Sequence, residues 1–351
     1  MKGLVYRGPA DVEVREVPDP GPPDDDGAVV RVSAAGICGS DLHIYRGDAF
    51  SADTGFCLGH EAVGRVTAVG CRVREVAVGD RVLVPASVGC TSCPPCRTGW
   101  VTRCERRTGT LDTFYGLHAG LPGSQAELLA VPYADANLVL LPDGISDAAA
   151  VVLTDNAPTA WYGARRAGIR PGETVAVIGL GAVGLMAVQS ALVMGAARVL
   201  ALDPLPERRR RAADLGAVPL TGSPDPKSEL RAATGGHGPD VVIEAVGADA
   251  TIDLAIRAVR HAGRVSIVGV THNRAFPMHL QLVQVKELDL AIGLASMQRE
   301  IPALLALCAQ GRLSPEQVVT HHLPLADGSV AYRRYAARAD GIGKIILHPG
   351  R

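Results

Sequence analysis

The chain has 351 residues, of which 47% are hydrophobic and 20% are charged, a composition typical of a folded globular protein with room for two domains. Its formal net charge of −1 provides no bulk field for binding nucleic acid or an anionic membrane. The N-terminal segment carries charges throughout and lacks an apolar signal sequence, which predicts a cytoplasmic protein.

The first 85 residues have the pattern of short, irregular strands. The run VEVREV (12–17) alternates apolar and polar residues. A turn-rich segment, PDPGPPDDDG (18–27), separates it from a second strand-like run, AVVRVSAAG (28–36). Short Val-rich runs separated by glycines continue to residue 85. The pattern predicts a β-rich region.

From about residue 155, strands alternate with helices. Strands are predicted at 174–178, 198–203, 240–247 and 264–270, and helices at 182–195, 206–215 and 251–260. This alternation predicts parallel βαβ units and a doubly wound sheet. The uncharged stretch Val175–Ala197 could suggest a membrane span, but its four glycines and β-branched start favour a buried strand, a turn and a buried helix. After about residue 297 the chain returns to a helix and a final strand, KIILHP (344–349).

A glycine-rich turn joins the first of these strands to the first helix. Gly179, Gly181 and Gly184, with Ala182 and Val183 between the last two, form the pattern G-x-G-x-x-G. In this context the first glycine permits a tight turn, the second lets the backbone approach a pyrophosphate, and the third allows close packing of helix on strand. The pattern predicts dinucleotide binding at the helix N-terminus.

Asp203 ends the next strand, about 20 residues further on. A carboxylate there can accept hydrogen bonds from the adenosine ribose and repels a 2′-phosphate, which predicts NAD rather than NADP. The alternative is that Asp203 only caps the following helix. The basic run Arg208–Arg211 favours a solvated helix face, although Arg208 can reach the cofactor.

Four of the eight cysteines lie within 15 residues, with Gly and Pro around them: Cys90, Cys93, Cys96 and Cys104. Without a secretory signal, a disulfide framework is not expected. Four thiolates close a tetrahedral shell around zinc, so this segment predicts a structural zinc site. The alternative, four reduced thiols packed as small apolar residues, fits poorly because the segment contains many turn residues and little apolar sequence.

Two segments upstream carry candidate ligands for a second zinc. One is GICGSDLH, which contains Cys38, Ser40, Asp41 and His43, and the other is GHE, which contains His60 and Glu61. A Cys, a His and a carboxylate that leave one coordination position open form a catalytic zinc site. Either segment alone is weak, since a lone His is more often an ordinary packed or surface residue.

Taken together, these segments resemble the zinc-dependent medium-chain alcohol dehydrogenases, and the likeness covers essentially the whole chain. The GHE run, with Gly64, Gly70 and Val73, fits that family's signature. The resemblance implies an α/β fold: a GroES-like β-rich catalytic domain at 1–154 and 297–351, and an NAD-binding Rossmann domain at 155–296. It also implies an enzyme with two zinc ions per chain that transfers a hydride between NAD and an alcohol or carbonyl substrate.

The resemblance also assigns roles to single residues. Cys38 and His60 match ligands of the catalytic zinc, and Glu61 matches a carboxylate that becomes a ligand in some members. Asp155 stands where many members have a ligand Cys, with the alternative that it caps the helix that follows. Ser40 matches the hydroxyl that bonds the substrate oxygen.

Three further positions complete the resemblance. His43 matches the end of a proton relay, and Asp41 matches the carboxylate that orients the zinc-binding histidine. Thr159 matches a position near the nicotinamide. For Ser40 and Asp41 the alternative is that both are ordinary turn residues.

The sequence leaves the substrate open. A polyol, an amino alcohol or a natural-product carbinol fits the same site. The pocket candidates, chosen by rough position only, are Ala86, Asp112, Phe114, Tyr115 and Leu294. A catalytically silent NAD-binding protein would have no need for the zinc ligands together with Ser40 and His43, and a zinc-free quinone or enone reductase should lack the cysteine lobe and the GHE segment.

The segment ELDLAIGL (287–294) alternates like an edge strand that could pair across a two-fold axis. By resemblance we expect a homo-oligomer, with a tetramer favoured over a dimer.

Overall fold

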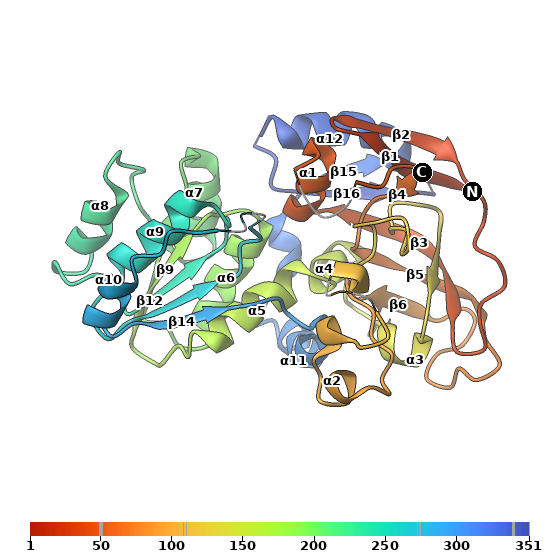
Figure 1. Cartoon of the computed structure of the whole chain (residues 1–351), viewed down its shortest axis with the longest axis horizontal. Coiled ribbons are helices and arrows are strands. Elements are labelled where there is room, and N and C mark those ends of the chain that lie inside the picture. Colours follow the sequence, from red (N-terminus) through yellow and green to blue (C-terminus); the bar gives the residue numbers. More distant parts are fainter. Residues whose placement is uncertain are drawn as a thin grey trace. The chain divides into compact units, whose positions relative to one another are not determined.

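The computed structural model describes residues 1–48, 52–107, 109, 111–271, 273, 275–338 and 341–350 (Figure 1). The chain divides into two compact units: Met1–Pro158 with Ser296–Arg351, and Thr159–Ala295. The sequence places the boundaries after residues 154 and 296, whereas these units divide after Pro158 and Ala295. The first difference arises because Asp155 and Asn156 are buried against Cys38 of the first unit. Helix α5 (Asn156–Arg166) therefore begins in one unit and ends in the other.

The first unit is β-rich, as predicted. One sheet has the order β2-β1-β4; a larger one has the order β15-β16-β3-β5-β6-β8, and β7 also pairs with β3. All these pairs are antiparallel except β15 with β16. The strands are β1 Lys2–Gly8, β2 Asp11–Glu16, β3 Ala28–Ile37, β4 Phe56–Cys57, β5 Ala62–Val69, β6 Arg81–Val84, β7 Leu128–Val131, β8 Val139–Leu140, β15 Val319–Pro324 and β16 Lys344–His348.

Valine and alanine side chains from these strands form the core of the first unit, including Val30, Val32, Ala62, Val82 and Val84. The helices of the unit are α1 Gly39–Arg46, α2 Pro94–Arg97, α3 Ala134–Asn137, α4 Asp147–Leu153, α11 Met297–Ala309 and α12 Gly328–Ala336. Short 3₁₀ turns are η1 Val101–Arg103, η2 Leu111–Thr113, η3 Pro315–Val318 and η4 Leu325–Asp327.

Two helix termini in this unit position the candidate zinc ligands. Helix α1 begins directly after β3, where the Asp41 carboxylate accepts a hydrogen bond of 2.9 Å from the backbone N–H of Cys38. Helix α4 begins at Ser146, whose hydroxyl accepts the Ala149 N–H. The end of α4 brings the chain to Asp155. Local capping therefore fixes both segments that carry candidate ligands.

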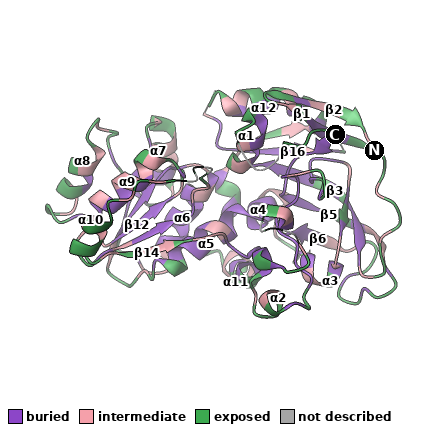
Figure 2. Cartoon of the chain, viewed as in Figure 1, coloured by how far each residue is buried: buried purple, intermediate pink, exposed green. Residues whose placement is uncertain are grey.

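The second unit is a parallel sheet with the order β11-β10-β9-β12-β13-β14, which confirms the predicted doubly wound fold. Its strands β9 and β12 are buried, as Figure 2 shows. The strands are β9 Thr174–Ile178, β10 Arg198–Leu202, β11 Val218–Pro219, β12 Val241–Glu244, β13 Arg264–Ile267 and β14 Asp289–Ile292. The helices are α6 Ala182–Val193, α7 Pro206–Asp214, α8 Pro226–Ala232, α9 Asp249–Ala258 and α10 Leu280–Val285.

The strand order of this sheet reverses between β9 and β12. A doubly wound sheet binds its ligand at such a switch point, outside the carboxyl ends of the strands. The glycine-rich turn follows the carboxyl end of β9 and opens α6. The fold therefore places the turn at the position that the motif requires.

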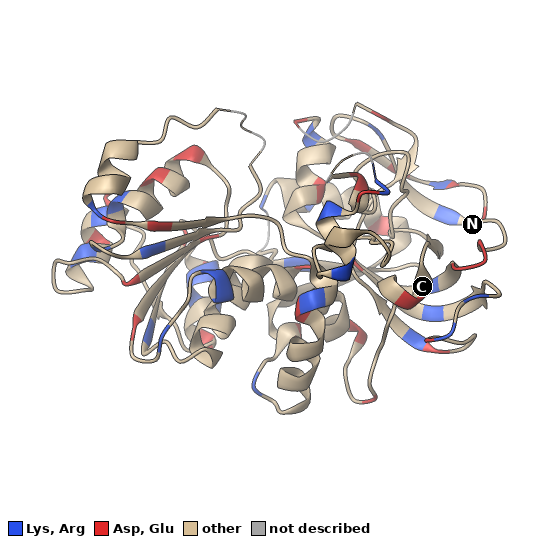
Figure 3. Ribbon diagram, turned by 60° about the horizontal axis from the view of Figure 1, so that its bottom comes forward, with Lys and Arg blue, Asp and Glu red and all other residues tan. Residues whose placement is uncertain are grey.

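The stretch Val175–Ala197 consists of β9, the glycine turn and helix α6, as predicted. Among the described residues, no helix has both the length and the apolar character needed to cross a membrane. Charged residues of both signs are interspersed in each unit (Figure 3).

Candidate metal and cofactor sites

Four candidate ligands from separate parts of the first unit converge on one point. Cys38 precedes α1, His60 and Glu61 precede β5, and Asp155 follows α4. Each offers one ligand atom, and these atoms all lie within 4.8 Å of one another. The Asp155 Oδ2 atom lies 3.4 Å from Cys38 Sγ and 3.6 Å from His60 Nε2. A thiol, an imidazole and carboxylates are the donor set of a catalytic zinc site.

The electrostatics of this cluster favour a cation. Burial, followed by the negative charges of Asp155 and Glu61, raises the pKa of the Cys38 thiol. Burial, the largest single influence, opposes a charge on His60, but the Asp41 carboxylate together with hydrogen bonds to Asp155 and Cys38 outweighs it and raises the pKa of the imidazole. A thiolate is therefore stable here only beside a compensating positive charge, and a metal ion must compete with protons. The cluster fits zinc on these grounds.

Side chains of α1 surround His60. The Asp41 Oδ1 atom lies 3.2 Å from His60 Nδ1, within ion-pair distance although without a well-aligned hydrogen bond. Because Asp41 faces Nδ1, the other ring nitrogen, Nε2, is the one that faces Asp155. The Ser40 hydroxyl lies 3.2 Å from this same Nε2 atom. His43 follows in the same helix and is half-buried.

Lys344 was not singled out from the sequence, yet it lies at this site. Its ammonium group pairs with Glu61 Oε2 and donates a hydrogen bond of 3.2 Å to the Ile37 carbonyl oxygen. Both partners of the ion pair are fully buried. The second carboxylate oxygen, Glu61 Oε1, has no hydrogen-bond partner among the described residues, so one oxygen remains available to a metal ion.

Two buried amides also escaped the sequence analysis. Gln125 donates to the Gly36 carbonyl oxygen at 2.8 Å and lies 3.4 Å from Asp41 Oδ2. Asn156 directs its amide nitrogen toward Cys38 Sγ and Asp155. Asn156 adjoins Asp155 in sequence, which was the only available signal, whereas nothing local indicates Gln125.

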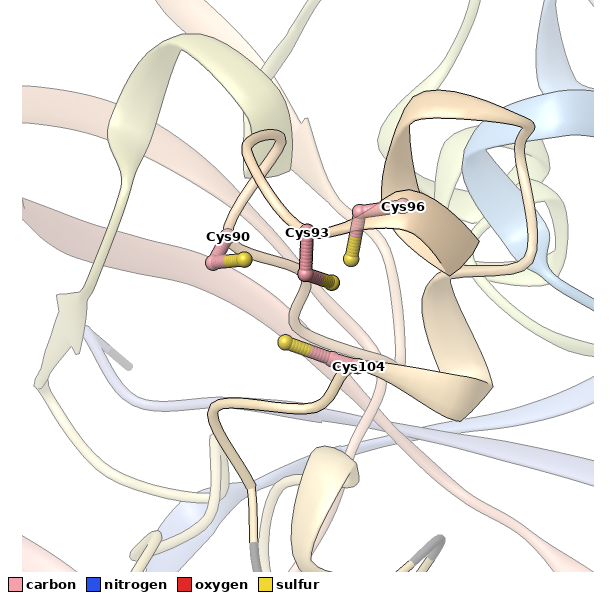
Figure 4. A group of neighbouring side chains, drawn as sticks. All are labelled: Cys90, Cys93, Cys96 and Cys104. Carbon is pink, nitrogen blue, oxygen red and sulfur yellow. The ribbon is translucent and has the colours of Figure 1, made fainter.

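The cysteine lobe forms a second group of candidate ligands. The four Sγ atoms of Cys90, Cys93, Cys96 and Cys104 lie within 4.8 Å of one another and point toward a common centre (Figure 4). Burial opposes ionisation of Cys90, but hydrogen bonds from the Ser92 side chain and from nearby backbone N–H groups lower its pKa to about 6. The lobe thus contains a ready thiolate and fits a closed four-sulfur zinc shell.

The glycine turn of the second unit has the geometry that a dinucleotide needs. Gly179 has a φ of +88°, in the left-handed region, and a Cβ atom on Gly184 would clash with the Gly179 carbonyl oxygen. A Cβ atom on Gly181 would meet nothing within 4 Å, so the turn is open at the position of closest backbone approach to a ligand. Ala182 and Val183 begin helix α6, whose N-terminus favours phosphate.

Asp203 lies beside this turn. Its Oδ2 atom accepts the Leu180 N–H at 2.9 Å, and its Oδ1 atom accepts the Leu205 N–H at 2.9 Å. Since the capping residue of α7 is Leu205, Asp203 ties the glycine turn to the end of β10 rather than only capping that helix. The Arg208 guanidinium lies 3.5 Å from Asp203 Oδ2. Thr159 is the first residue of the second unit and is half-buried.

Of the five pocket candidates, Ala86, Phe114 and Tyr115 are buried in the first unit. The Ala86 N–H donates to the Thr154 carbonyl oxygen at 3.0 Å, and the Tyr115 N–H to the Ala86 carbonyl oxygen at 3.3 Å, so this segment lies beside the chain that leads to Asp155. Asp112 lies in η2, and Leu294 belongs to the second unit.

Comparison with known proteins gives consistent matches along the chain. Residues 24–143 match the alcohol dehydrogenase GroES-like domain, and residues 182–310 match the zinc-binding dehydrogenase family. A probable zinc-binding alcohol dehydrogenase of Mycobacterium tuberculosis is 43% identical over 99% of this chain and 89% of its own length.

Solved structures of alcohol dehydrogenases also resemble this chain over its whole length. An alcohol dehydrogenase from Thermus sp. ATN1 is 42% identical, with a TM-score of 0.91 over 99% of both chains. An NAD-dependent alcohol dehydrogenase is 30% identical, with a TM-score of 0.84 over 99% of both chains. The likeness thus extends over both units.

Proposed function

Because this chain belongs to the zinc-type alcohol dehydrogenases of the medium-chain dehydrogenase/reductase family, we infer that it is a zinc-dependent oxidoreductase that interconverts an alcohol and a carbonyl compound. We propose NAD as the hydride acceptor. The observation that carries the proposal is the convergence of Cys38, His60, Glu61 and Asp155 within 4.8 Å. This donor set has no function in a silent binding protein.

We propose that Cys38, His60 and Asp155 hold the catalytic zinc, with Glu61 Oε1 able to approach it. Zinc, when bound, supplies Lewis acidity that lowers the pKa of an alcohol and polarises a carbonyl. Asp41 orients His60 by facing its Nδ1 atom.

The proton of the alcohol needs an acceptor within the chain. Ser40 Oγ lies 3.2 Å from His60 Nε2, the atom that would face the metal, so its hydroxyl can bond the substrate oxygen and accept its proton while it hands its own proton on. His43, on the same helix, then passes the proton toward solvent.

The second unit binds the cofactor. Its glycine turn, from Gly179 to Gly184, leaves room for a pyrophosphate at Gly181. NAD, when bound, carries the redox chemistry, and the protein orients it. Asp203 bonds the adenosine ribose, and Thr159 packs near the nicotinamide. The four-cysteine lobe holds a second zinc with a structural role, because four sulfur ligands leave no coordination position for a substrate.

A screen for turnover tests this function. Primary and secondary alcohols, polyols and amino alcohols, and the matching carbonyl compounds, are offered with NAD(H) and NADP(H) while NADH or NADPH absorbance is followed. We expect zinc-dependent turnover with at least one substrate class. A zinc-loaded protein that binds NAD and turns over none of these would support a silent binding protein instead.

Cofactor choice depends on the balance between Asp203 and Arg208. Asp203→Asn keeps the shape of the side chain and one acceptor for the glycine turn but removes the charge. We expect kcat/KM with NAD to fall about 10- to 100-fold, since a hydrogen bond to a charged group contributes about 1.5–3 kcal/mol. The kcat/KM with NADP should rise, because the Arg208 guanidinium is then released to bind a 2′-phosphate.

The matched control is the double variant Asp203→Asn with Arg208→Leu, which should lose NAD and gain no NADP activity. Unchanged cofactor preference in the single variant would contradict the role of Asp203.

We also propose that the chain forms a homo-oligomer, with a tetramer favoured over a dimer. Strand β14 is the terminal strand of its sheet, and Ile292 at its end is 57% exposed. Helix α10, just before it in the chain, exposes Leu280 (68%) and Val285 (65%). An unpaired strand edge beside exposed apolar side chains is suited to a partner subunit. Sedimentation velocity that gives a monomer would contradict this proposal.

A further inference from the structure

Asn156 is a fully buried amide in direct contact with two of the candidate ligands. Its Nδ2 atom lies 3.6 Å from Cys38 Sγ and 3.1 Å from Asp155 Oδ2. Cys38 and Asn156 are 118 positions apart in the chain, so this contact is made by the fold and not by local sequence.

The chemistry of the neighbours fixes the orientation of the amide. A carboxylate has only acceptor atoms, and so has a thiolate. If the amide were turned over, its oxygen would face two anionic groups and would be repelled by both. The NH₂ group must therefore face Cys38 and Asp155. The consequence is that Asn156 Oδ1 points elsewhere, and this buried atom has no hydrogen-bond partner among the described residues.

An unsatisfied buried amide oxygen opposes folding, since a buried polar group without a partner loses its hydrogen bonds to water and gains none in return. A residue chosen for packing alone, such as Leu or Met, would avoid that cost. The amide nitrogen explains why an asparagine stands here, because it donates to Cys38 Sγ and to the Asp155 carboxylate, two of the proposed metal ligands. Hydrogen bonds of this kind hold ligands in place and tune the charge that they offer to a metal.

We propose that Asn156 is a positioning residue of the catalytic zinc site, which holds Cys38 and Asp155 in ligating geometry and lowers the electron donation of the thiolate. This inference rests on the proposed function, because it needs a metal at Cys38. It concerns a residue that contacts no reacting atom. Weaker donation from sulfur leaves more positive charge on the metal, which strengthens its action on an alcohol.

The test uses the full-length protein with Asn156→Leu, which keeps the branched shape of the side chain and removes the donors. Zinc release to the chelator dipicolinate should become about 10- to 100-fold faster. With cobalt(II) as the probe metal, the sulfur-to-cobalt charge-transfer band should move to longer wavelength, because the thiolate lone pairs lose a stabilising donor. Subtraction of the Cys38→Ala spectrum removes any band from the four-cysteine lobe.

Thr154→Val is the matched control. Thr154 is also fully buried, two positions away, and within the described part of the chain its hydroxyl bonds only the Val151 carbonyl oxygen, at 2.6 Å. This variant can lose stability but should keep wild-type zinc release and the wild-type band. Asn156→Ala, which also removes the donors and adds no charge, gives the same test if Asn156→Leu does not fold.

The outcomes separate the two proposals. A folded Asn156→Leu or Asn156→Ala protein with wild-type zinc release and an unmoved band would overturn the role of Asn156 while leaving the zinc site intact. Equal changes in Thr154→Val would also overturn it, since the effect would then be one of packing. Wild-type protein without any cobalt band that depends on Cys38 would instead refute the catalytic zinc site itself.

Discussion

Cys38→Ala is expected to reduce the zinc content from two ions per chain to one and to abolish alcohol turnover. The Cys38 thiol is one of the proposed ligands, whose atoms the fold brings within 4.8 Å of one another, and without it the two remaining proposed ligands, His60 and Asp155, would form an incomplete shell. Loss of Lewis-acid stabilisation worth several kcal/mol corresponds to a fall in kcat/KM of about 10³-fold or more. Mass spectrometry for metal content and NADH-coupled assays measure the two effects.

Cys308→Ala is the control, because Cys308 is half-buried in helix α11 and belongs neither to the four-cysteine lobe nor to the group of candidate ligands around Cys38. It should keep both ions and full activity. One zinc in both wild type and Cys38→Ala would mean that Cys38 is not a ligand. The NAD-binding alternatives without Lewis-acid chemistry would then become the better explanation.

The parts of the structure that the sequence predicts are those specified by short segments. The G-x-G-x-x-G turn needs only its own three glycines between a strand and a helix, and the structure has that turn after β9. The four-cysteine lobe spans 15 residues, and its thiols meet as expected. The alternation of strands and helices predicts the parallel sheet because each βαβ unit is complete within some 30 residues.

The candidate zinc cluster depends on the resemblance, since its members are far apart in the chain. The resemblance identifies Cys38, His60, Glu61 and Asp155, and the fold brings Asp155 to Cys38 from 117 positions away. The alternative that Asp155 caps the helix that follows is weakened by its contacts with both Cys38 and His60.

The sequence does not reveal which residues pair with buried charged side chains. The Glu61–Lys344 pair joins positions 283 residues apart, and Lys344 stands in the ordinary strand KIILH, where a lysine is most simply interpreted as a surface residue. Gln125 likewise reaches Asp41 from a position 84 residues away. The Glu61–Lys344 pairing follows from the way β16 lies beside β3 in the sheet, and no local periodicity encodes that neighbour.

Lys344→Met is expected to destabilise the first unit by about 3–5 kcal/mol, the usual cost of leaving a buried charge without its partner. Methionine fills the space of the lysine stem, so the loss comes from Glu61, whose carboxylate stays fully buried. Burial already raises the pKa of Glu61, and the Lys344 charge is the main influence that lowers it. Chemical denaturation measures the free energy of unfolding.

The double variant Glu61→Gln with Lys344→Met separates the ion pair from the packing. Because it removes both charges, most of the lost stability should return, as neutral replacements of buried ion pairs often cost little. Alcohol turnover by the double variant should nevertheless be slower than in the wild type, since a glutamine cannot offer the metal a carboxylate. If the double variant were no more stable than Lys344→Met, the lysine would act through its hydrogen bond to the Ile37 carbonyl oxygen and its packing, and the charge of Glu61 would be satisfied by another group.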